Sequence, residues 1–132
     1  MKRTISDPVV YTNGLFFINA LLWGYIGYPL AALILTVTAC ASLSYHLPKE
    51  SWKPTYIFDV CMAHFALLYT VSVAYPFISF SMWIILFSIL VLGLYVKNQA
   101  HVRKRYDLFH TLWHVCVFVG QGVLAGCVYG LK

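Results

Sequence analysis

Two long uncharged stretches constrain the fold of this chain more strongly than any other feature of its sequence. No Asp, Glu, Lys or Arg occurs in residues 8–47 or in residues 60–96. A helix rises 1.5 Å per residue and a bilayer core is about 30 Å thick, so each stretch is long enough to cross a membrane twice. Only 10% of all residues are charged, whereas a soluble domain would carry about 25%. The sequence therefore predicts an integral membrane protein built from helices.

Turn-forming residues divide both stretches near their middles. Segment 24–29 contains glycines, tyrosines and a proline, and Tyr75-Pro76 interrupts the second stretch. Glycine and proline break helices, and tyrosine favours the membrane interface. With the polar segments that follow each stretch, these breaks predict an all-α, polytopic transmembrane helix bundle that forms a single domain over residues 1–132. Its five spans are expected at about 9–26, 29–47, 55–74, 77–96 and 106–129.

The basic residues predict how the bundle is oriented. With five spans, eight of the nine Lys and Arg residues lie on the side of the N-terminus, and only Lys132 lies on the other. The positive-inside rule then places the N-terminus in the cytoplasm. A single span over residues 9–47 would move Lys2 and Arg3 to the opposite side, so five spans explain the charges better. We expect these cations to face lipid head groups, with no nucleic acid partner.

Two sets of small side chains are expected to serve packing. The four cysteines all fall in apolar segments, which favours buried thiols over a disulfide framework: Cys40, Cys61, Cys116 and Cys127. Three glycines repeat at four-residue spacing in the last span, and such a stripe lets another helix approach closely: Gly122, Gly126 and Gly130. This glycine face is a candidate contact between two copies of the chain.

Ionisable side chains are costly inside a membrane, so each one needs an explanation. Asp59 is the only carboxylate in the apolar body of the chain and lies near the start of the third span. Ser42 and His46 lie four residues apart at the end of the second span, and His110 and His114 are spaced in the same way at the start of the fifth. Residues four apart share a helix face. The predicted topology brings all five side chains to one depth, near the cytoplasmic side.

These five side chains have the chemistry of a zinc site. Three imidazoles suit Zn²⁺ in a tetrahedral site whose fourth position is open to water. A carboxylate such as Asp59 can accept a proton, and a hydroxyl such as Ser42 can stabilise an oxyanion. Each residue also has an ordinary interpretation. A histidine near a helix end is often interfacial, Ser42 can bond its own helix, and Asp59 can cap a helix or pair with a loop lysine.

Three other polar residues are expected to lie outside this site. His64 follows Asp59 by five residues, which turns it about 140° away on a helix, and we expect it in packing or a helix contact. His101 belongs to the basic segment and is expected to be solvated. Asp107 is expected to cap the last helix, with a contact to a site histidine as the alternative.

The ordered set Ser42-x-x-x-His46, Asp59 and His110-x-x-x-His114 resembles the signature of the CREST superfamily. That superfamily includes the alkaline ceramidases, the progestin and adipoQ receptors and proteins that remodel lipid anchors. The resemblance implies an intramembrane zinc ion held by His46, His110 and His114. It also implies that Asp59 holds and deprotonates the zinc-bound water, and that Ser42 either lies behind the metal ligands or assists the oxyanion. The family core has three helices between the Asp helix and the last His helix, whereas one is predicted here, which leaves the pocket open to the bilayer or closed by a second copy.

Three functions follow as hypotheses. The first is a zinc-dependent intramembrane hydrolase of a lipid amide or ester, similar to a ceramidase, whose substrate enters from the membrane. The second is a non-catalytic receptor or assembly protein in which zinc joins helices. The third is a small b-type cytochrome with His46 and either His110 or His114 as axial haem ligands. Ser42 and Asp59 favour the hydrolase, because haem ligation requires neither.

Overall fold

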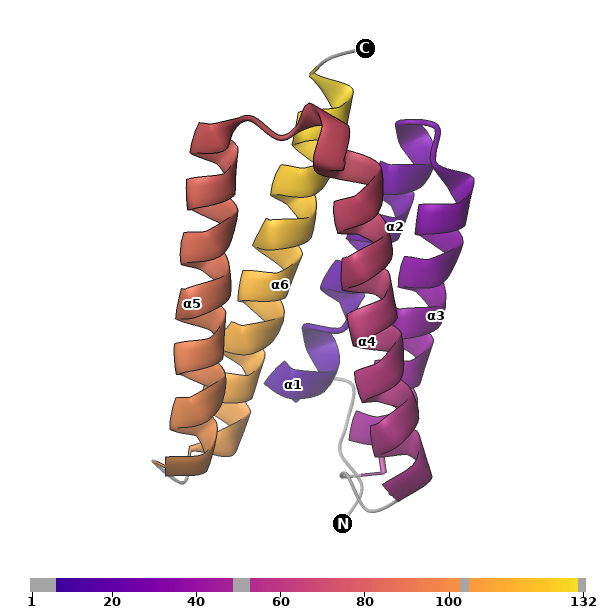
Figure 1. The fold of residues 1–132 in the computed structure, drawn as a ribbon. Coiled ribbons are helices and arrows are strands. Elements are labelled where there is room, and N and C mark those ends of the chain that lie inside the picture. The colour runs from indigo at the N-terminus through magenta and orange to yellow at the C-terminus, as the bar shows by residue number, and fades with distance from the viewer. Residues whose placement is uncertain (1–6, 49–52, 103–104, 131–132) are drawn as a thin grey trace.

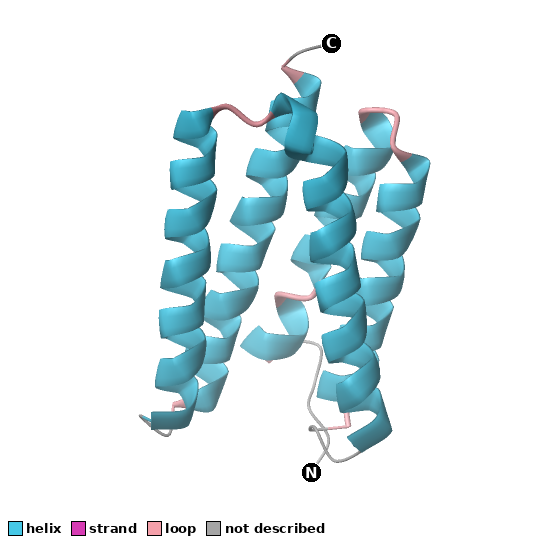
Figure 2. Ribbon diagram, viewed as in Figure 1, coloured by secondary structure: helices cyan, strands magenta, loops and turns pink. Residues whose placement is uncertain are grey.

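The computed structural model describes residues 7–48, 53–102 and 105–130, and this part of the chain is helical with no strand. The predicted all-α class is therefore confirmed. The helices are α1 (Pro8–Tyr11), α2 (Gly14–Tyr25), α3 (Pro29–His46), α4 (Lys53–Ala74), the short 3-10 helix η1 (Tyr75–Phe77), α5 (Phe80–Val102) and α6 (Tyr106–Tyr129). Short turns connect them (Figure 2). Several predicted surface charges and the side chain of His101 lie outside the described part: Lys2, Arg3, Lys49, Arg103, Lys104 and Lys132.

Four helices are long and apolar enough to cross a membrane, namely Pro29–His46, Lys53–Phe77, Phe80–Gln99 and Tyr106–Tyr129. They correspond to the second to fifth predicted spans. Their outward faces carry large exposed apolar side chains, for example Phe80 and Phe87 on α5. Such a surface is costly in water and favourable in lipid. The chain is therefore consistent with an integral membrane protein, whereas the count of five spans is not confirmed.

The first predicted span is interrupted at Thr12 and Asn13, which separate α1 from α2. The backbone tightens at this point, because the amide of Asn13 bonds the Val10 carbonyl at 3.2 Å, a three-residue step. Both side chains bond back to the preceding turn, with Thr12 Oγ1 at 2.9 Å from the Pro8 carbonyl oxygen and Asn13 Nδ2 at 2.8 Å from that of Val9. Such side-chain bonds compete with a regular helix. Hydropathy alone does not detect the break, because the flanking residues are all apolar.

The turns between the other helices follow the predicted breaks. Gly27 ends the connection after α2 with φ of 90°, a conformation that glycine adopts without strain. Pro29 then opens α3 at a position where its missing N–H is not needed. Tyr75-Pro76 forms η1, after which the chain turns into α5. These turns place the C-terminal end of α3 and the first turns of α6 at the same end of the bundle as α1 (Figure 1).

Packing around α6 builds the core. α6 lies against α5, α2, α4 and α1, while α3 packs between α2 and α4. The buried apolar cluster includes Trp23 of α2, Leu35 of α3, and Leu124 and Val128 of α6. α5 packs mainly against α6, and Gly93 allows this close approach because a Cβ there would come within 2.9 Å of the Trp113 ring.

The cysteines and the glycine stripe were both predicted to serve packing, and the structure tests this for each of them. All four cysteines are free, but only Cys127 is buried, while Cys40 and Cys61 are exposed on the surface of the protein. The prediction of buried thiols is wrong for these two, because an apolar residue in a membrane helix can face lipid instead of protein. A Cβ added at Gly122 or Gly126 would meet nothing within 4 Å. Among the described helices, none packs directly on these two positions, and the role of the glycine face between copies stays a prediction.

Candidate metal centre

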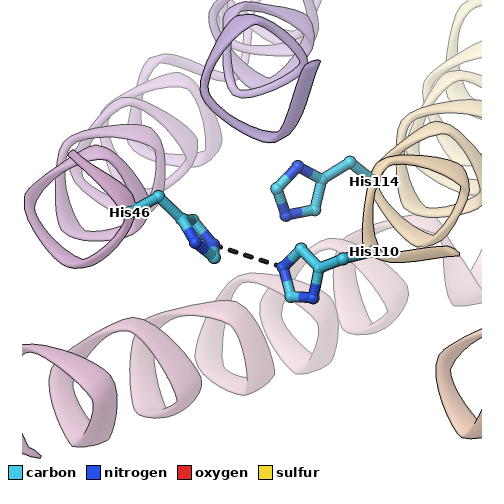
Figure 3. A group of neighbouring side chains, drawn as sticks. All are labelled: His46, His110 and His114. Carbon is cyan, nitrogen blue, oxygen red and sulfur yellow. Dashed lines mark hydrogen bonds between the residues drawn. The ribbon is translucent and has the colours of Figure 1, made fainter. Parts of the chain in front are cut away.

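Three histidines from two helices converge at one end of the bundle. His46 is the last residue of α3, and His110 and His114 lie one turn apart near the start of α6. Their rings point toward a common point between the helices (Figure 3). Nε2 of His46 and Nε2 of His110 are 3.2 Å apart, and one ring nitrogen from each residue lies within 4.8 Å of the others. The structure thus brings together the three histidines that the sequence proposed as ligands.

The spacing of these nitrogens fits a metal ion. Two nitrogens bound to one tetrahedral zinc ion at 2.0–2.1 Å lie about 3.3 Å apart, close to the 3.2 Å between His46 and His110. The widest separation of 4.8 Å closes to this value with a shift of about 1.5 Å. The rings meet edge to face, with interplanar angles of 68°, 67° and 72°. Without an ion, one proton between His46 and His110 makes their short contact a hydrogen bond.

Two of the three histidines are buried and the third is partly exposed. His46 is 0% exposed and His114 is 3% exposed, whereas His110 is half-buried. Aromatic rings cover the imidazoles: Tyr106 stacks on His110 with ring centroids 4.8 Å apart, and Tyr45 lies 4.8 Å from His46. Access to the histidines is therefore from the side of His110.

Asp59 and Ser42 lie next to the histidines. Asp59 lies close enough to Ser42, His46 and Lys97 to interact with each of them. Ser42 is buried and lies one turn before His46 on the same face of α3. Asp59 is half-buried and comes from α4, which begins at Lys53. It is therefore not the N-cap of that helix, and among the described lysines it lies near Lys97 of α5.

Thr12 is a contact of the centre that the sequence did not reveal. Its Oγ1 lies 3.0 Å from Nδ1 of His114, and both side chains are buried. Phe16 of α2 meets the same imidazole edge to face at 5.6 Å. A polar Thr-Asn pair inside an otherwise apolar stretch was the available signal, because buried polar groups in a membrane need partners. The partner itself, 102 positions away in the sequence, depends on tertiary structure.

Two further polar residues, His64 and Asp107, were predicted to lie outside the centre. His64 is exposed on α4, and its Nδ1 lies 2.7 Å from the Val60 carbonyl oxygen, so it contacts its own helix and not another one. Asp107 lies in the first turn of α6, where the helix dipole favours a carboxylate, but the N-cap residue is Arg105. Asp107 is therefore not the N-cap residue, and its alternative contact with a site histidine stays a prediction.

The geometry argues against the haem hypothesis. Two axial ligands approach the iron from opposite faces of the macrocycle, which must fit between them. The 3.2 Å between the nitrogens of His46 and His110 leaves no room for a porphyrin, and the third histidine crowds the same point.

Comparisons with protein-family models, curated proteins and solved structures find no match to this chain. The likeness to the CREST superfamily therefore depends on the residues themselves. What the structure contributes is an arrangement of three histidines that can hold a metal ion.

Proposed function

We propose that this protein is a zinc-dependent intramembrane hydrolase that cleaves a lipid amide or ester bond. The observation that carries the proposal is the convergence of His46, His110 and His114 within 4.8 Å. Ser42 and Asp59 lie beside them. A purely structural zinc site is closed by four protein ligands, whereas a catalytic site has three and keeps one position open. Three imidazoles beside a carboxylate that is not itself part of the triad match the second pattern.

The ligand type favours zinc. Imidazole nitrogens are common zinc ligands, and three of them leave one position for water or substrate. A bound zinc ion would bring the pKa of a coordinated water to about 7 and polarise a carbonyl group. The half-buried His110 leaves this position accessible, while the buried His46 and His114 keep bulk water away from the other side.

The protein's own side chains would handle the proton. Asp59 would accept a proton from the attacking water and deliver it to the leaving nitrogen or oxygen as the acyl bond breaks. The Ser42 hydroxyl lies beside this carboxylate, where it would stabilise the developing oxyanion. Water adds to the carbonyl carbon, and the products are a fatty acid and a free amine or alcohol.

The membrane arrangement belongs to the same proposal. We propose five crossings, with residues 8–25 as an interrupted first crossing and the N-terminus in the cytoplasm. The described basic residues Lys53, Lys97 and Arg105 all belong to helix ends on the side of the metal centre (Figure 1), which the positive-inside rule places in the cytoplasm. Because α5 packs mainly on α6, a lipid substrate would approach the metal centre laterally from the membrane, beside α5.

The proposal is tested with purified protein in lipid nanodiscs. We expect one zinc per chain by elemental analysis, and release of fatty acid from an amide or ester lipid in a mass-spectrometric assay. In water enriched in ¹⁸O the released carboxylate should gain one ¹⁸O atom. His110→Ala should lose both zinc and activity, while Asp59→Asn should keep zinc and lose activity. Protein without stoichiometric zinc, or with equal zinc after His110→Ala, would refute the metal centre.

One observation favours a second candidate, a non-catalytic zinc-stabilised membrane protein. Among the described residues, α3 and α6 make few direct contacts with each other, yet they supply all three histidines. A metal would therefore join two helices that are otherwise linked through their neighbours. In this case Asp59→Asn would keep zinc and leave the biological function intact, with no product from any lipid.

A further inference from the structure

We infer that Thr12 is a positioning residue that fixes the proton of His114 on Nδ1 and so reserves Nε2 for the metal. The inference rests on the proposed metal centre and adds a residue from a part of the chain that the sequence motif does not include. Thr12 lies at the junction of α1 and α2, and its Oγ1 is 3.0 Å from His114 Nδ1.

The Thr12 hydroxyl has one proton and three acceptors within reach. These are the carbonyl oxygens of Pro8 at 2.9 Å and Val9 at 3.3 Å, and Nδ1 of His114 at 3.0 Å. A helical threonine commonly gives its proton to the carbonyl three or four residues before it, and the Pro8 oxygen is the nearest of the three. The hydroxyl oxygen then presents a lone pair toward His114, and we assign the proton of this contact to Nδ1.

The consequence for the metal follows from the imidazole itself. When Nδ1 carries the proton of a neutral ring, Nε2 has the lone pair and can bind a metal. One ring nitrogen of His114 points toward the α1–α2 segment, and the other toward His46 and His110 (Figure 3). Because Nδ1 is the nitrogen at Thr12, the nitrogen that faces the other two histidines is Nε2. The hydrogen bond thus selects the tautomer that the metal needs and holds the imidazole ring in a fixed orientation.

The interruption of the first span explains how the hydroxyl reaches this place. Val9 and Val10 of α1 are buried, at 0% and 3% exposure, and α1 packs against α6 beside His114. Asn13, also fully buried, bonds back to the Val9 carbonyl and supports the break. The short helix is therefore fixed inside the bundle, which gives the Thr12 hydroxyl a defined position relative to the imidazole.

Side chains that hold the second nitrogen of a metal-binding histidine change metal affinity by about 10–100-fold when they are removed. Thr12→Val keeps the shape of the side chain and removes only the hydroxyl, whereas Thr12→Ser keeps the hydroxyl. Thr36→Val is the matched control, because the Thr36 hydroxyl bonds only the Ala32 carbonyl of its own helix at 2.8 Å. Zinc affinity is measured by competition with a chelator in nanodiscs. We expect about 10–100-fold weaker binding for Thr12→Val and near wild-type binding for Thr12→Ser and Thr36→Val.

A second measurement needs no metal. In metal-free protein labelled with ¹⁵N histidine, long-range ¹H–¹⁵N spectra distinguish Nδ1–H from Nε2–H, and His114→Ala assigns the signal. We expect Nδ1–H in the wild type and in Thr12→Ser, and a change in the tautomer ratio in Thr12→Val. Nε2–H in the wild type, or unchanged zinc affinity in Thr12→Val, would overturn the role of Thr12 while leaving the metal centre intact. Failure of the centre is recognised separately, since the wild type would then bind zinc no better than His110→Ala, and this result would also exclude a role of Thr12 in metal binding.

Discussion

Zinc should stabilise the folded protein through His46, and removal of that one imidazole should abolish the effect. His46 brings α3 to α6, two helices that have few direct contacts of their own in the described part of the chain. An ion held by His46 of α3 and by the two histidines of α6 binds the folded arrangement and has little affinity for separated helices. Ligand that binds only the folded state raises its stability by mass action.

The size of the effect follows from occupancy. Free zinc at 100 times its Kd should add about 2.7 kcal/mol to the free energy of unfolding. For a chain of this length, such a change corresponds to a rise in Tm on the order of 10 °C. Removal of His46 leaves two ligands on one helix, which can no longer join α3 to α6, so the rise in His46→Ala should fall to a few degrees or less.

The assay is thermal unfolding of the purified protein, followed by circular dichroism with increasing free zinc. The matched control is His64→Ala, because His64 is an exposed histidine that bonds only its own helix through Val60. It should show the full wild-type rise. If zinc raised the Tm of His46→Ala as much as that of the wild type, the ion would be binding elsewhere and the assignment of His46 as a ligand would be refuted.

Three further predictions concern single side chains. Asp59→Asn should lower kcat for lipid hydrolysis by about 10²–10⁴-fold with zinc content unchanged, measured on the same sample, and full activity would exclude a role as general base. Gly93→Leu should separate α5 from α6, because even a Cβ at this position comes within 2.9 Å of the Trp113 ring; we expect destabilisation of about 1–3 kcal/mol in denaturant unfolding, and an unchanged midpoint would contradict the observed close approach. Gln121→Leu should change stability by less than about 1 kcal/mol in the same assay, because the loss of the 3.0 Å bond from Gln121 to Thr70 is offset by removal of a buried amide oxygen that has no hydrogen-bond partner; a loss of several kcal/mol would contradict this balance.

The helical class and the meeting of the histidines could be predicted because both depend on local patterns. The uncharged stretches determine membrane helices by length alone, and four of the five expected spans correspond to helices of sufficient length. His110 and His114 share a face because any helix places residues four apart on one side. His46 reaches them because the turns return α3 and α6 to the same end of the bundle, which follows from the number of crossings between them.

Features that depend on contacts between distant segments were not predictable in this way. An apolar helix residue can face protein or lipid, and hydropathy has the same value in both cases, so the exposure of Cys40 and Cys61 was missed. Asp59 lies inside α4, which begins at Lys53, so it does not cap that helix. These outcomes depend on how the helices pack, and the sequence of a single helix does not contain that information.

The interruption at Thr12 connects the largest departure from the predicted fold with the chemistry of the site. A continuous helix over residues 9–26 would satisfy its backbone fully and would be the cheaper way to cross lipid. The chain instead has two buried polar residues there, Thr12 and Asn13, which bond to the preceding turn and break the helix. Departures from regular helix rules are most often found at functional sites. Here the break places the Thr12 hydroxyl 3.0 Å from His114, a candidate metal ligand. A break that served only packing would need no polar contact with His114. The contact therefore explains the irregular first span, which its hydropathy does not explain.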